Sequence, residues 1–171
     1  MIQILDNFFE EKLFINVKNY VTTKLIFTPR YHDENKERNN DNYYGSRFQL
    51  TQDKNLLDTF VKQSEKKFNI KIKELGFDSG VDIKNLNNFQ PHIDKGLKLN
   101  ILIMIAGPTA VTNGTVFYAD EKNSKVLDIH VGFRENRAIM FSSDIWHSPH
   151  ANKESNTKRY TASLFVVDYD V

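Results

Sequence analysis

The second half of the chain is a succession of short apolar or alternating segments, each closed by a turn signal. Apolar residues at every second position predict half-buried strands, and the nearly continuous run Leu97–Ala106 predicts a strand buried on both faces. Dipeptides such as Gly107-Pro108 and Asn113-Gly114 separate these segments. Strands at this regular spacing predict an all-β sandwich or barrel, because a sheet must bury one face and hide its edges. The expected strands cover residues 70–73, 81–84, 97–106, 115–119, 125–131, 137–142 and 159–167.

Two amphipathic helices are expected before these strands. Apolar residues at helical spacing predict the first over about Phe8–Val21, with Asn7 and Glu10 as a capping box at its start. A second apolar stripe predicts another helix over residues 56–68. A short strand is expected over residues 2–5. We expect the two helices to support one face of the β structure.

Length and charge narrow the class of protein further. A chain of 171 residues can bury about 70% of its unfolded surface, which suits a single domain over residues 1–171. Within it we expect helical support over about 1–68 and a β core over about 69–171. A formal net charge of +1 provides no general field for a phosphate backbone, so nucleic acid is not an expected partner. No apolar run approaches ~20 residues and no secretory signal is visible, so we expect a cytoplasmic protein without a membrane partner.

The sequence contains no cysteine, and this limits the chemistry that it can carry. Disulfides, thiolate zinc sites, iron–sulfur clusters and cysteine nucleophiles are all excluded. Any bound metal must therefore be held by histidine and carboxylate. The chain has five histidines, few enough to weigh each one.

His92 and Asp94 stand two residues apart. In an extended chain, residues i and i+2 project from the same side, so an imidazole nitrogen and a carboxylate oxygen can converge on one point. A solvated strand end would carry the same pair, so the motif depends on its context.

That context lies further along the chain, where His147 follows an apolar strand and Arg159 opens another. A buried arginine is costly unless it meets an anion, and Thr161, on the same strand face, supplies a hydroxyl donor for that anion. Two histidines and one carboxylate on one side of an iron form the facial triad of non-haem Fe(II) oxygenases, which leaves coordination positions open. The candidate metal ligands and catalytic residues are therefore His92, Asp94 and His147.

Several features in this order resemble the motifs of the 2-oxoglutarate and Fe(II)-dependent dioxygenases, over about residues 84–167. The opening helix and the strand before the H-x-D motif look most like the prolyl 4-hydroxylase branch, in the small form typical of bacteria and viruses. The matching features are H-x-D at His92 and Asp94, a distal metal histidine at His147, an R-x-S/T pair at Arg159 and Thr161, and strand sequences over 113–117 and 137–141.

The resemblance implies a double-stranded β-helix, that is, a cupin-like jelly roll. It implies Fe(II), 2-oxoglutarate as co-substrate and O2, with ascorbate as a candidate supporting reductant, and it assigns Arg159 and Thr161 to the C5 carboxylate of 2-oxoglutarate. The implied reaction is hydroxylation of an unactivated C–H bond, most like prolyl 4-hydroxylation of a peptide or protein, with succinate and CO2 as co-products. We expect a monomer or a weak dimer.

Three other histidines compete for the metal. His150 lies three residues after His147, but it follows a proline in a polar segment and is expected to point away from the site. His130 also stands two residues from a carboxylate, Asp128, on the polar side of an expected strand, and is expected to face solvent. His32 falls in a polar segment and is expected to be solvated.

A loop is expected over residues 31–46, because this stretch is rich in Asn and charge. Its aromatic residues Tyr43 and Tyr44, together with Arg47, could cover a bound substrate, and an ordinary surface loop is the alternative. Trp146 is expected to be a wall of the core or of the pocket.

The sequence departs from the family pattern in several places. Asn113 replaces the first glycine of one strand motif, and the loop after Asp94 is short. The family's collagen-type members bind 2-oxoglutarate through a lysine, whereas Lys158 is expected on the strand face opposite to Arg159. A tyrosine that assists 2-oxoglutarate binding in the family has no evident counterpart. Two alternatives therefore stay open for function: a hydroxylase of free amino acids or small molecules, and a non-catalytic cupin-like module that binds a metal or a sugar.

Overall fold

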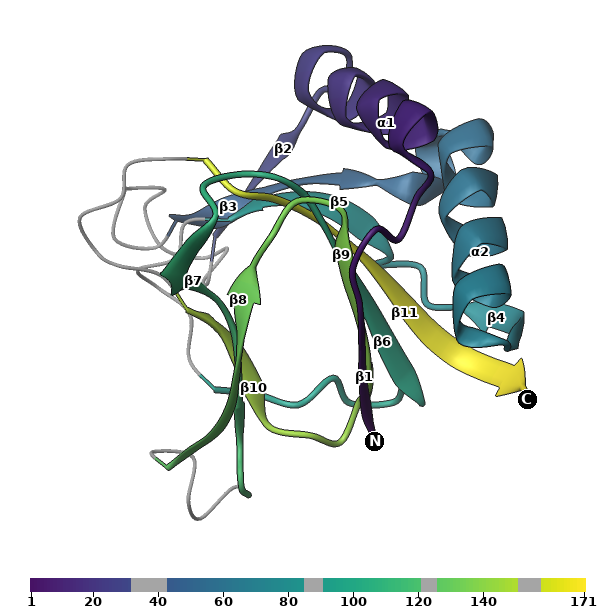
Figure 1. The fold of residues 1–171 in the computed structure, drawn as a ribbon. Coiled ribbons are helices and arrows are strands. Elements are labelled where there is room, and N and C mark those ends of the chain that lie inside the picture. The colour runs from purple at the N-terminus through teal and green to yellow at the C-terminus, as the bar shows by residue number, and fades with distance from the viewer. Residues whose placement is uncertain (32–42, 85–90, 121–125, 151–157) are drawn as a thin grey trace.

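The computed structural model describes residues 1–31, 43–84, 91–120, 126–150 and 158–171. Within these ranges the chain forms 11 strands, two α-helices and one 3-10 turn, η1 (Leu50–Gln52) (Figure 1). The helices are α1 (Glu11–Thr23) and α2 (Lys54–Phe68). The strands are β1 (Ile2–Leu5), β2 (Thr28–Tyr31), β3 (Tyr43–Gln49), β4 (Lys71–Leu75), β5 (Gly80–Lys84), β6 (Leu99–Ala106), β7 (Ala110–Tyr118), β8 (Leu127–Phe133), β9 (Arg137–Ser142), β10 (His147–His150) and β11 (Tyr160–Asp170).

The strands form two antiparallel sheets. The larger sheet has eight strands, in the order β1-β9-β6-β11-β5-β3-β2, with β4 also paired to β11. The smaller sheet has three strands, in the order β10-β7-β8. From β6 to β11 the chain passes from the larger sheet to the smaller one and back twice. This alternation is the jelly-roll topology of a double-stranded β-helix, so the predicted fold class, mainly β with flanking helices, is confirmed.

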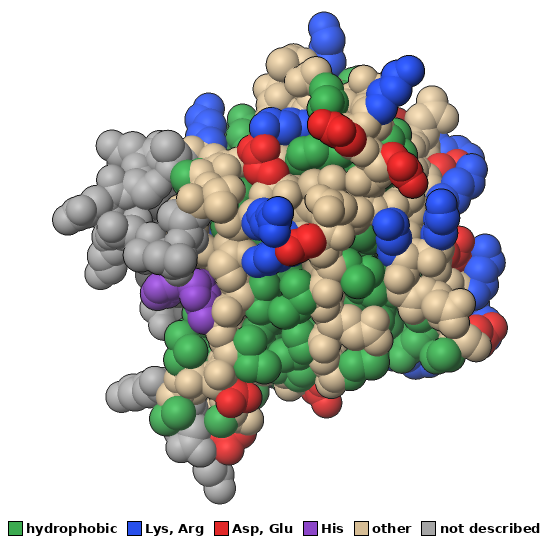
Figure 2. All heavy atoms as spheres, in the orientation of Figure 1, with side chains coloured by type: hydrophobic (Ala, Val, Ile, Leu, Met, Phe, Trp, Pro, Cys, Tyr) green, Lys and Arg blue, Asp and Glu red, His purple; other side chains and the backbone are tan. Residues whose placement is uncertain are grey.

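Strand β6 separates the two cores of the molecule. All eight of its residues are buried, as the apolar run predicts. Its alternate side chains point to opposite faces: Ile101 and Ile103 belong to the core beneath the helices, whereas Leu102 and Met104 belong to the core between the sheets. Side chains of this second core occupy part of the space between the sheet ribbons, and Figure 2 shows hydrophobic atoms there.

Both helices lie against the face of the larger sheet that is turned away from the smaller sheet (Figure 1). Helix α2 buries Phe60 and Phe68 on that face. It begins where the Asp53 side chain accepts a hydrogen bond of 3.0 Å from the backbone N–H of Leu56, and it ends at Asn69 in the left-handed conformation. The helices therefore close one face of the sheet and leave the other for a site.

Helix α1 begins at Glu11, three residues later than predicted, and the predicted capping box does not form. Asn7 has a φ of 52°, and the backbone N–H groups of Phe8 and Phe9 donate to Asn136, to its carbonyl and its side chain respectively. Phe8 and Phe9 are buried in the core in this connection between β1 and α1. Core packing has overridden the local helix signal.

The prediction of a loop over residues 31–46 is wrong at both ends, because Tyr31 is the last residue of strand β2 and residues 43–49 form strand β3. Residues 32–42 lie outside the described part of the chain. Strand β3 pairs with β5, with Arg47 opposite Asp82, so a polar sequence forms a strand because its charges are matched across the pair. The described part of the chain contains no helix that is long and apolar enough to span a membrane.

Candidate functional site

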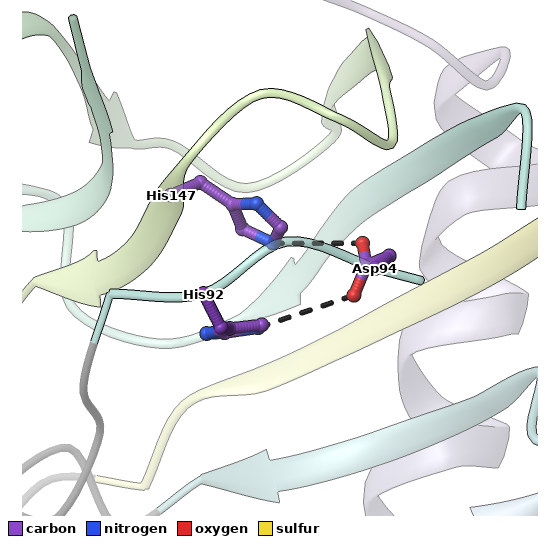
Figure 3. Close-up of side chains that lie close together, drawn as sticks. All are labelled: His92, Asp94 and His147. Atoms are coloured by element: carbon purple, nitrogen blue, oxygen red, sulfur yellow. Dashed lines mark ion pairs between the residues drawn. The ribbon is translucent and has the colours of Figure 1, made fainter. Parts of the chain in front are cut away.

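His92 and His147 are held opposite each other by a short β-bridge (Figure 3). The N–H of His92 donates to the carbonyl of His147 over 3.0 Å, and the N–H of His147 returns a bond of 2.9 Å. The N–H of Asp94 donates to the carbonyl of Ser143 over 2.9 Å. This bond fixes the backbone at Asp94, two residues after His92. These backbone bonds hold two segments that are far apart in the sequence side by side, next to the core between the two sheets.

The three side chains converge. His92 Nε2 lies 4.0 Å from Asp94 Oδ1, and His147 Nε2 lies 3.6 Å from Asp94 Oδ2. The candidate ligand atoms all lie within 4.8 Å of one another, and across the described ranges this is the one group of three or more such side chains. The side chains of Asp94 and His147 are 11% and 7% exposed, whereas that of His92 is 41% exposed. Two imidazoles and a carboxylate on one side are a donor set that suits iron.

The protonation state of His147 suits metal binding. Burial lowers the pKa of His147 to about 4, although the Asp94 carboxylate opposes this effect, and His92 adds to it. The Nδ1 of His147 lies 2.9 Å from the carbonyl of Ile145, so Nδ1 carries the donated proton. The Nε2 lone pair is then directed at the cluster, which is the arrangement of a metal-ligating imidazole.

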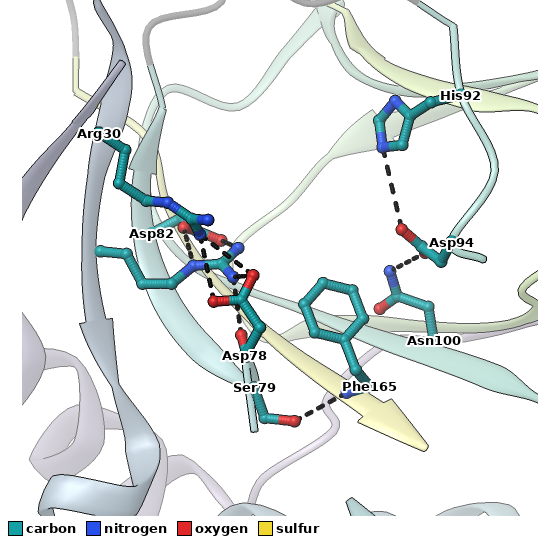
Figure 4. A network of polar contacts seen from close by, with 9 residues as sticks. Arg30, Asp78, Ser79, Asp82, His92, Asp94, Asn100 and Phe165 are labelled. Carbon is teal, nitrogen blue, oxygen red and sulfur yellow. Dashed lines mark hydrogen bonds and ion pairs between the residues drawn. The ribbon is translucent and has the colours of Figure 1, made fainter. Parts of the chain in front are cut away.

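Asn100 fixes the carboxylate of the cluster. Its Nδ2 donates a bond of 2.8 Å to Asp94 Oδ2, and its side chain is buried in β6 (Figure 4). Sequence reasoning missed this residue, although a polar Asn within the apolar run 97–106 was a visible signal.

The cluster opens into a chamber between the two sheets, and Arg159 lies at its buried end. Arg159 is 2% exposed, and its Nη1 donates to the carbonyls of Gly114, over 2.6 Å, and His150, over 3.4 Å. Its guanidinium also lies 5.5 Å from the centre of the Phe133 ring. Burial lowers the pKa of Arg159 to about 10, against the opposing charge of Asp82. The chamber lining includes the triad with Asn100, Leu102, Thr115, Phe141, Pro149, Arg159 and Phe165.

Buried polar atoms without hydrogen-bond partners gather around this chamber. They include Arg159 Nε, Thr115 Oγ1 and Asn100 Oδ1, which belong to residues of the chamber lining. Buried polar groups are normally paired, so their concentration here fits a polar ligand with several oxygen atoms. Thr161 is completely buried on the same strand face as Arg159, but its side chain is not part of the chamber lining.

A network of ion pairs lies beside Arg159, on the β2, β3 and β5 side of the larger sheet, and contributes to the chamber lining (Figure 4). Arg47 donates from Nε and Nη2 to the two oxygens of Asp82, over 2.7 and 2.9 Å, and pairs with Asp78 over 2.6 Å. Arg30 pairs with Asp78 over 3.2 Å. Arg47 therefore lines the site, as part of a fixed strand rather than of a covering loop.

The two tyrosines beside Arg47 have separate outcomes. The hydroxyl of Tyr43 lies 2.9 Å from Ser46 Oγ, and its ring lies 5.8 Å from that of Tyr31. Tyr43 is not among the residues that line the chamber. The side chain of Tyr44 lies outside the described part of the structure.

His130 and His150 are not among the residues that line the chamber. His130 and His150 face each other across Gly114, with ring centroids 5.4 Å apart, and His150 is exposed. His130 lies on the face of β8 opposite to Val131 of the core between the sheets and is partly exposed, although its Nε2 is buried without a partner. The reason is that Gly114 has no side chain, which lets the ring lie over the strand. His32 lies outside the described residues.

No protein-family model matches the sequence, and no curated protein sequence matches it. Solved structures match it in fold. The non-heme alpha ketoglutarate dependent epimerase SnoN from nogalamycin biosynthesis superposes with a TM-score of 0.63 at 9% identity, covering 96% of this chain and 78% of that one. A prolyl hydroxylase from Trichoplax adhaerens, in complex with a peptide fragment of hypoxia inducible factor, gives a TM-score of 0.61 at 14% identity, covering 96% and 82%.

SnoN has also been crystallised with Fe3+, alpha ketoglutarate and nogalamycin RO, and that structure gives a TM-score of 0.60 at 9% identity, covering 96% of this chain and 78% of that one. At these identities the similarity shows a shared fold. Any chemistry shared with these neighbours must be argued from the residues of the site.

Proposed function

We propose that this protein is an Fe(II)- and 2-oxoglutarate-dependent dioxygenase, with His92, Asp94 and His147 as iron ligands. The observation that carries the proposal is the convergence of these three side chains, within 4.8 Å, on a chamber that also holds the buried Arg159. A module that only binds metal has no need of a buried cation facing the same chamber. The fold shared with alpha ketoglutarate dependent enzymes adds support.

Iron and 2-oxoglutarate, when bound with O2, supply an oxidative decarboxylation to succinate and CO2 coupled to oxidation of a substrate C–H bond. The chain's own residues bind and orient the reactants. Three side-chain ligands leave coordination positions open, and Asn100 keeps the Asp94 carboxylate in place. Arg159, which lines the chamber, holds the far carboxylate of 2-oxoglutarate, and Thr161 is a candidate second donor from the sequence motif alone, because its side chain does not line the chamber. Apolar walls such as Leu102 and Phe141 exclude water from the chamber.

For the substrate, we propose a proline in a peptide or protein, hydroxylated at carbon 4. The support is the resemblance of the motifs to the prolyl 4-hydroxylase branch and the fold shared with a prolyl hydroxylase that binds a peptide. Oxidation of a small molecule is the second candidate, because SnoN, which binds nogalamycin RO, shares the fold equally well.

The test uses the purified chain with Fe(II), 2-oxoglutarate, ascorbate and air. The expected result is succinate formation that depends on iron and stops in Asp94→Ala. Mass spectrometry of a proline-containing peptide library should then show the gain of one oxygen atom, and a matched library with alanine in place of proline should not. Succinate formation without any peptide oxidation would move the proposal to a small-molecule substrate. Equal succinate in the wild type and in Asp94→Ala would refute the dioxygenase.

A further inference from the structure

Thr115 is a buried residue of the smaller sheet with an unpaired hydroxyl. It lies on β7, is 2% exposed and lines the chamber. Within the described part of the chain, its Oγ1 is buried and has no hydrogen-bond partner. A hydroxyl that is buried without a partner loses its hydrogen bonds to water, and this costs free energy. A polar ligand in the chamber would restore the lost bond.

The strand register places Thr115 on the same inner face as the metal cluster. Phe117, two residues further along β7, belongs to the core between the sheets, and residues i and i+2 of a strand face the same side. Phe117 is paired with His147 of the cluster. Thr115 is paired with Pro149, which also lines the chamber. The Thr115 hydroxyl therefore lies two residues along the paired strands from a candidate metal ligand.

This separation suits the length of 2-oxoglutarate. Two residues of an antiparallel strand rise about 6.5 Å. The carbons of the two carboxyl groups of 2-oxoglutarate are joined by four C–C bonds of about 1.5 Å, which span roughly 5 Å when the chain is extended. The carboxylate oxygens add to this reach. A molecule with one carboxylate at the cluster can therefore place the other beside Thr115.

Arg159 reaches the same place from the larger sheet. Its Nη1 donates over 2.6 Å to the carbonyl of Gly114, the residue before Thr115. Among the described residues its Nε is buried without a partner. An unpaired guanidinium N–H and an unpaired hydroxyl thus lie on neighbouring residues of the chamber lining. A carboxylate has two oxygens and can accept a hydrogen bond from each donor.

The hydroxyl that the sequence motif favours is placed differently. Thr161 is completely buried, opposite Asp82 on one neighbouring strand and Met104 on the other. Its Oγ1 also has no partner in the described ranges, so pairing does not distinguish it from Thr115. The chamber does, because Thr115 is part of its lining and Thr161 is not.

We propose that Thr115, and not Thr161, is the hydroxyl donor that holds the far carboxylate of 2-oxoglutarate together with Arg159. The inference rests on the proposed function, since 2-oxoglutarate is the ligand concerned. It moves this role from β11 to a residue of the smaller sheet, so that the co-substrate bridges the two sheets.

Calorimetric titration of the Mn(II)-loaded protein, without oxygen, tests the proposal. The probes are 2-oxoglutarate and 2-oxobutyrate, which share the 2-oxo acid group but differ by one carboxylate. Thr115→Val removes the hydroxyl and nearly keeps the shape, Thr115→Ser keeps the hydroxyl, and Thr161→Val removes the alternative donor. Thr28→Val is the same change at an exposed strand position.

We expect Thr115→Val to weaken the binding of 2-oxoglutarate by roughly 10- to 100-fold, as loss of a hydrogen bond to a charged group does, and to change 2-oxobutyrate much less. Thr115→Ser should recover most of the loss. Thr161→Val should weaken 2-oxoglutarate far less than Thr115→Val does, and Thr28→Val should bind both probes as the wild type does.

The outcomes separate this inference from the proposed function. If the wild type does not bind 2-oxoglutarate at all, the proposed function and the inference both fail. If the wild type binds it and Thr115→Val binds it equally well, or loses both probes equally, only the role of Thr115 is refuted. An equal or larger loss of 2-oxoglutarate in Thr161→Val would return the role to the motif residue and would also overturn the inference.

A second measurement needs no variant, so it stands even if Thr115→Val does not fold. A crystal structure of the wild type with Mn(II) and 2-oxoglutarate should place Thr115 Oγ1 at a hydrogen-bond distance of about 2.5–3.0 Å from an oxygen of the far carboxylate. A far carboxylate that is bound by Thr161 Oγ1, or that Thr115 Oγ1 does not contact, would overturn the proposal.

Discussion

Among the described residues, two pairs of histidines lie close together, and only one of them forms a candidate metal cluster. The rings of His92 and His147 lie 4.5 Å apart, and those of His130 and His150 lie 5.4 Å apart. Asp94 lies between the first two imidazoles. Among the described residues, no carboxylate joins the second pair in a comparable group.

The position of each pair relative to the sheet explains the difference. His147 and His150 are the first and last residues of β10, and residues three apart on a strand point to opposite faces. His147 is paired with Phe117 of the core between the sheets, whereas His150 is paired with Gly114. Proximity of histidines is therefore not sufficient for a site. A site also needs the inner face, where Asp94 and Arg159 converge on the same chamber.

The largest expected effect comes from removing the carboxylate of Asp94, which lies between the two imidazoles of the first pair. Asp94→Ala should abolish specific Fe(II) binding, because two imidazoles without the carboxylate cannot complete the donor set. Anaerobic calorimetry with Fe(II) measures this directly. The matched control is Asp144→Ala, an exposed carboxylate three residues before His147. Tight 1:1 iron binding by Asp94→Ala would break the distinction between the two pairs.

The next largest effect is expected at Arg159, which lines the same chamber as His92 and His147. Arg159→Met should weaken 2-oxoglutarate by about 30-fold or more while leaving Fe(II) affinity intact, because a buried charge partner of the anion is lost and no candidate metal ligand is changed. Lys158→Met, at an exposed neighbouring position, is the control. An unchanged 2-oxoglutarate affinity in Arg159→Met would remove this residue from the site.

A smaller effect is expected for the residue that supports the cluster. Asn100→Leu removes the hydrogen bond to Asp94 Oδ2 and should weaken Fe(II) binding by roughly tenfold to a hundredfold, as loss of a ligand-orienting partner does. Asn19→Leu, on the exposed face of α1, makes the same change without such a contact. Wild-type iron affinity in Asn100→Leu would show that the carboxylate is fixed by other means.

The smallest effect is expected at the second pair. His130→Gln and His150→Gln should bind Fe(II) and 2-oxoglutarate as the wild type does, because neither side chain faces the chamber. The backbone carbonyl of His150 that accepts from Arg159 is retained in the variant. A tenfold or greater loss of iron affinity in either variant would mean that the second pair contributes to the metal site.

The β core could be predicted from the sequence because its strands carry strong periodic signals. The alternation of β11 predicts which residues face each core: Ala162, Leu164 and Val166 are buried toward the helices, and Arg159 and Thr161 face inward. Strands β2, β3 and β10 were not predicted, because their sequences are largely polar or contain a proline. Their register depends on cross-strand charge pairs and on the β-bridge at His92, and neither is a periodic pattern.

The residues of the site also differ in how well the sequence alone identifies them. His92 and Asp94 share a local motif, so the sequence can point to them as a pair. Asn100 stands out as a polar residue in an apolar run, but its hydrogen bond to Asp94 depends on how two segments pack together. Such partners require the tertiary structure.

The central claim is that His92 and His147, together with Asp94, hold iron and 2-oxoglutarate, and that the pair His130 and His150 does not. Anaerobic addition of 2-oxoglutarate to the protein with one equivalent of Fe(II) tests it through the visible charge-transfer absorption of the complex. We predict an absorption band in the wild type and in the variants His130→Gln and His150→Gln, which fades when oxygen is admitted, and no band in Asp94→Ala. A band in Asp94→Ala, or its loss in His150→Gln, would contradict the account.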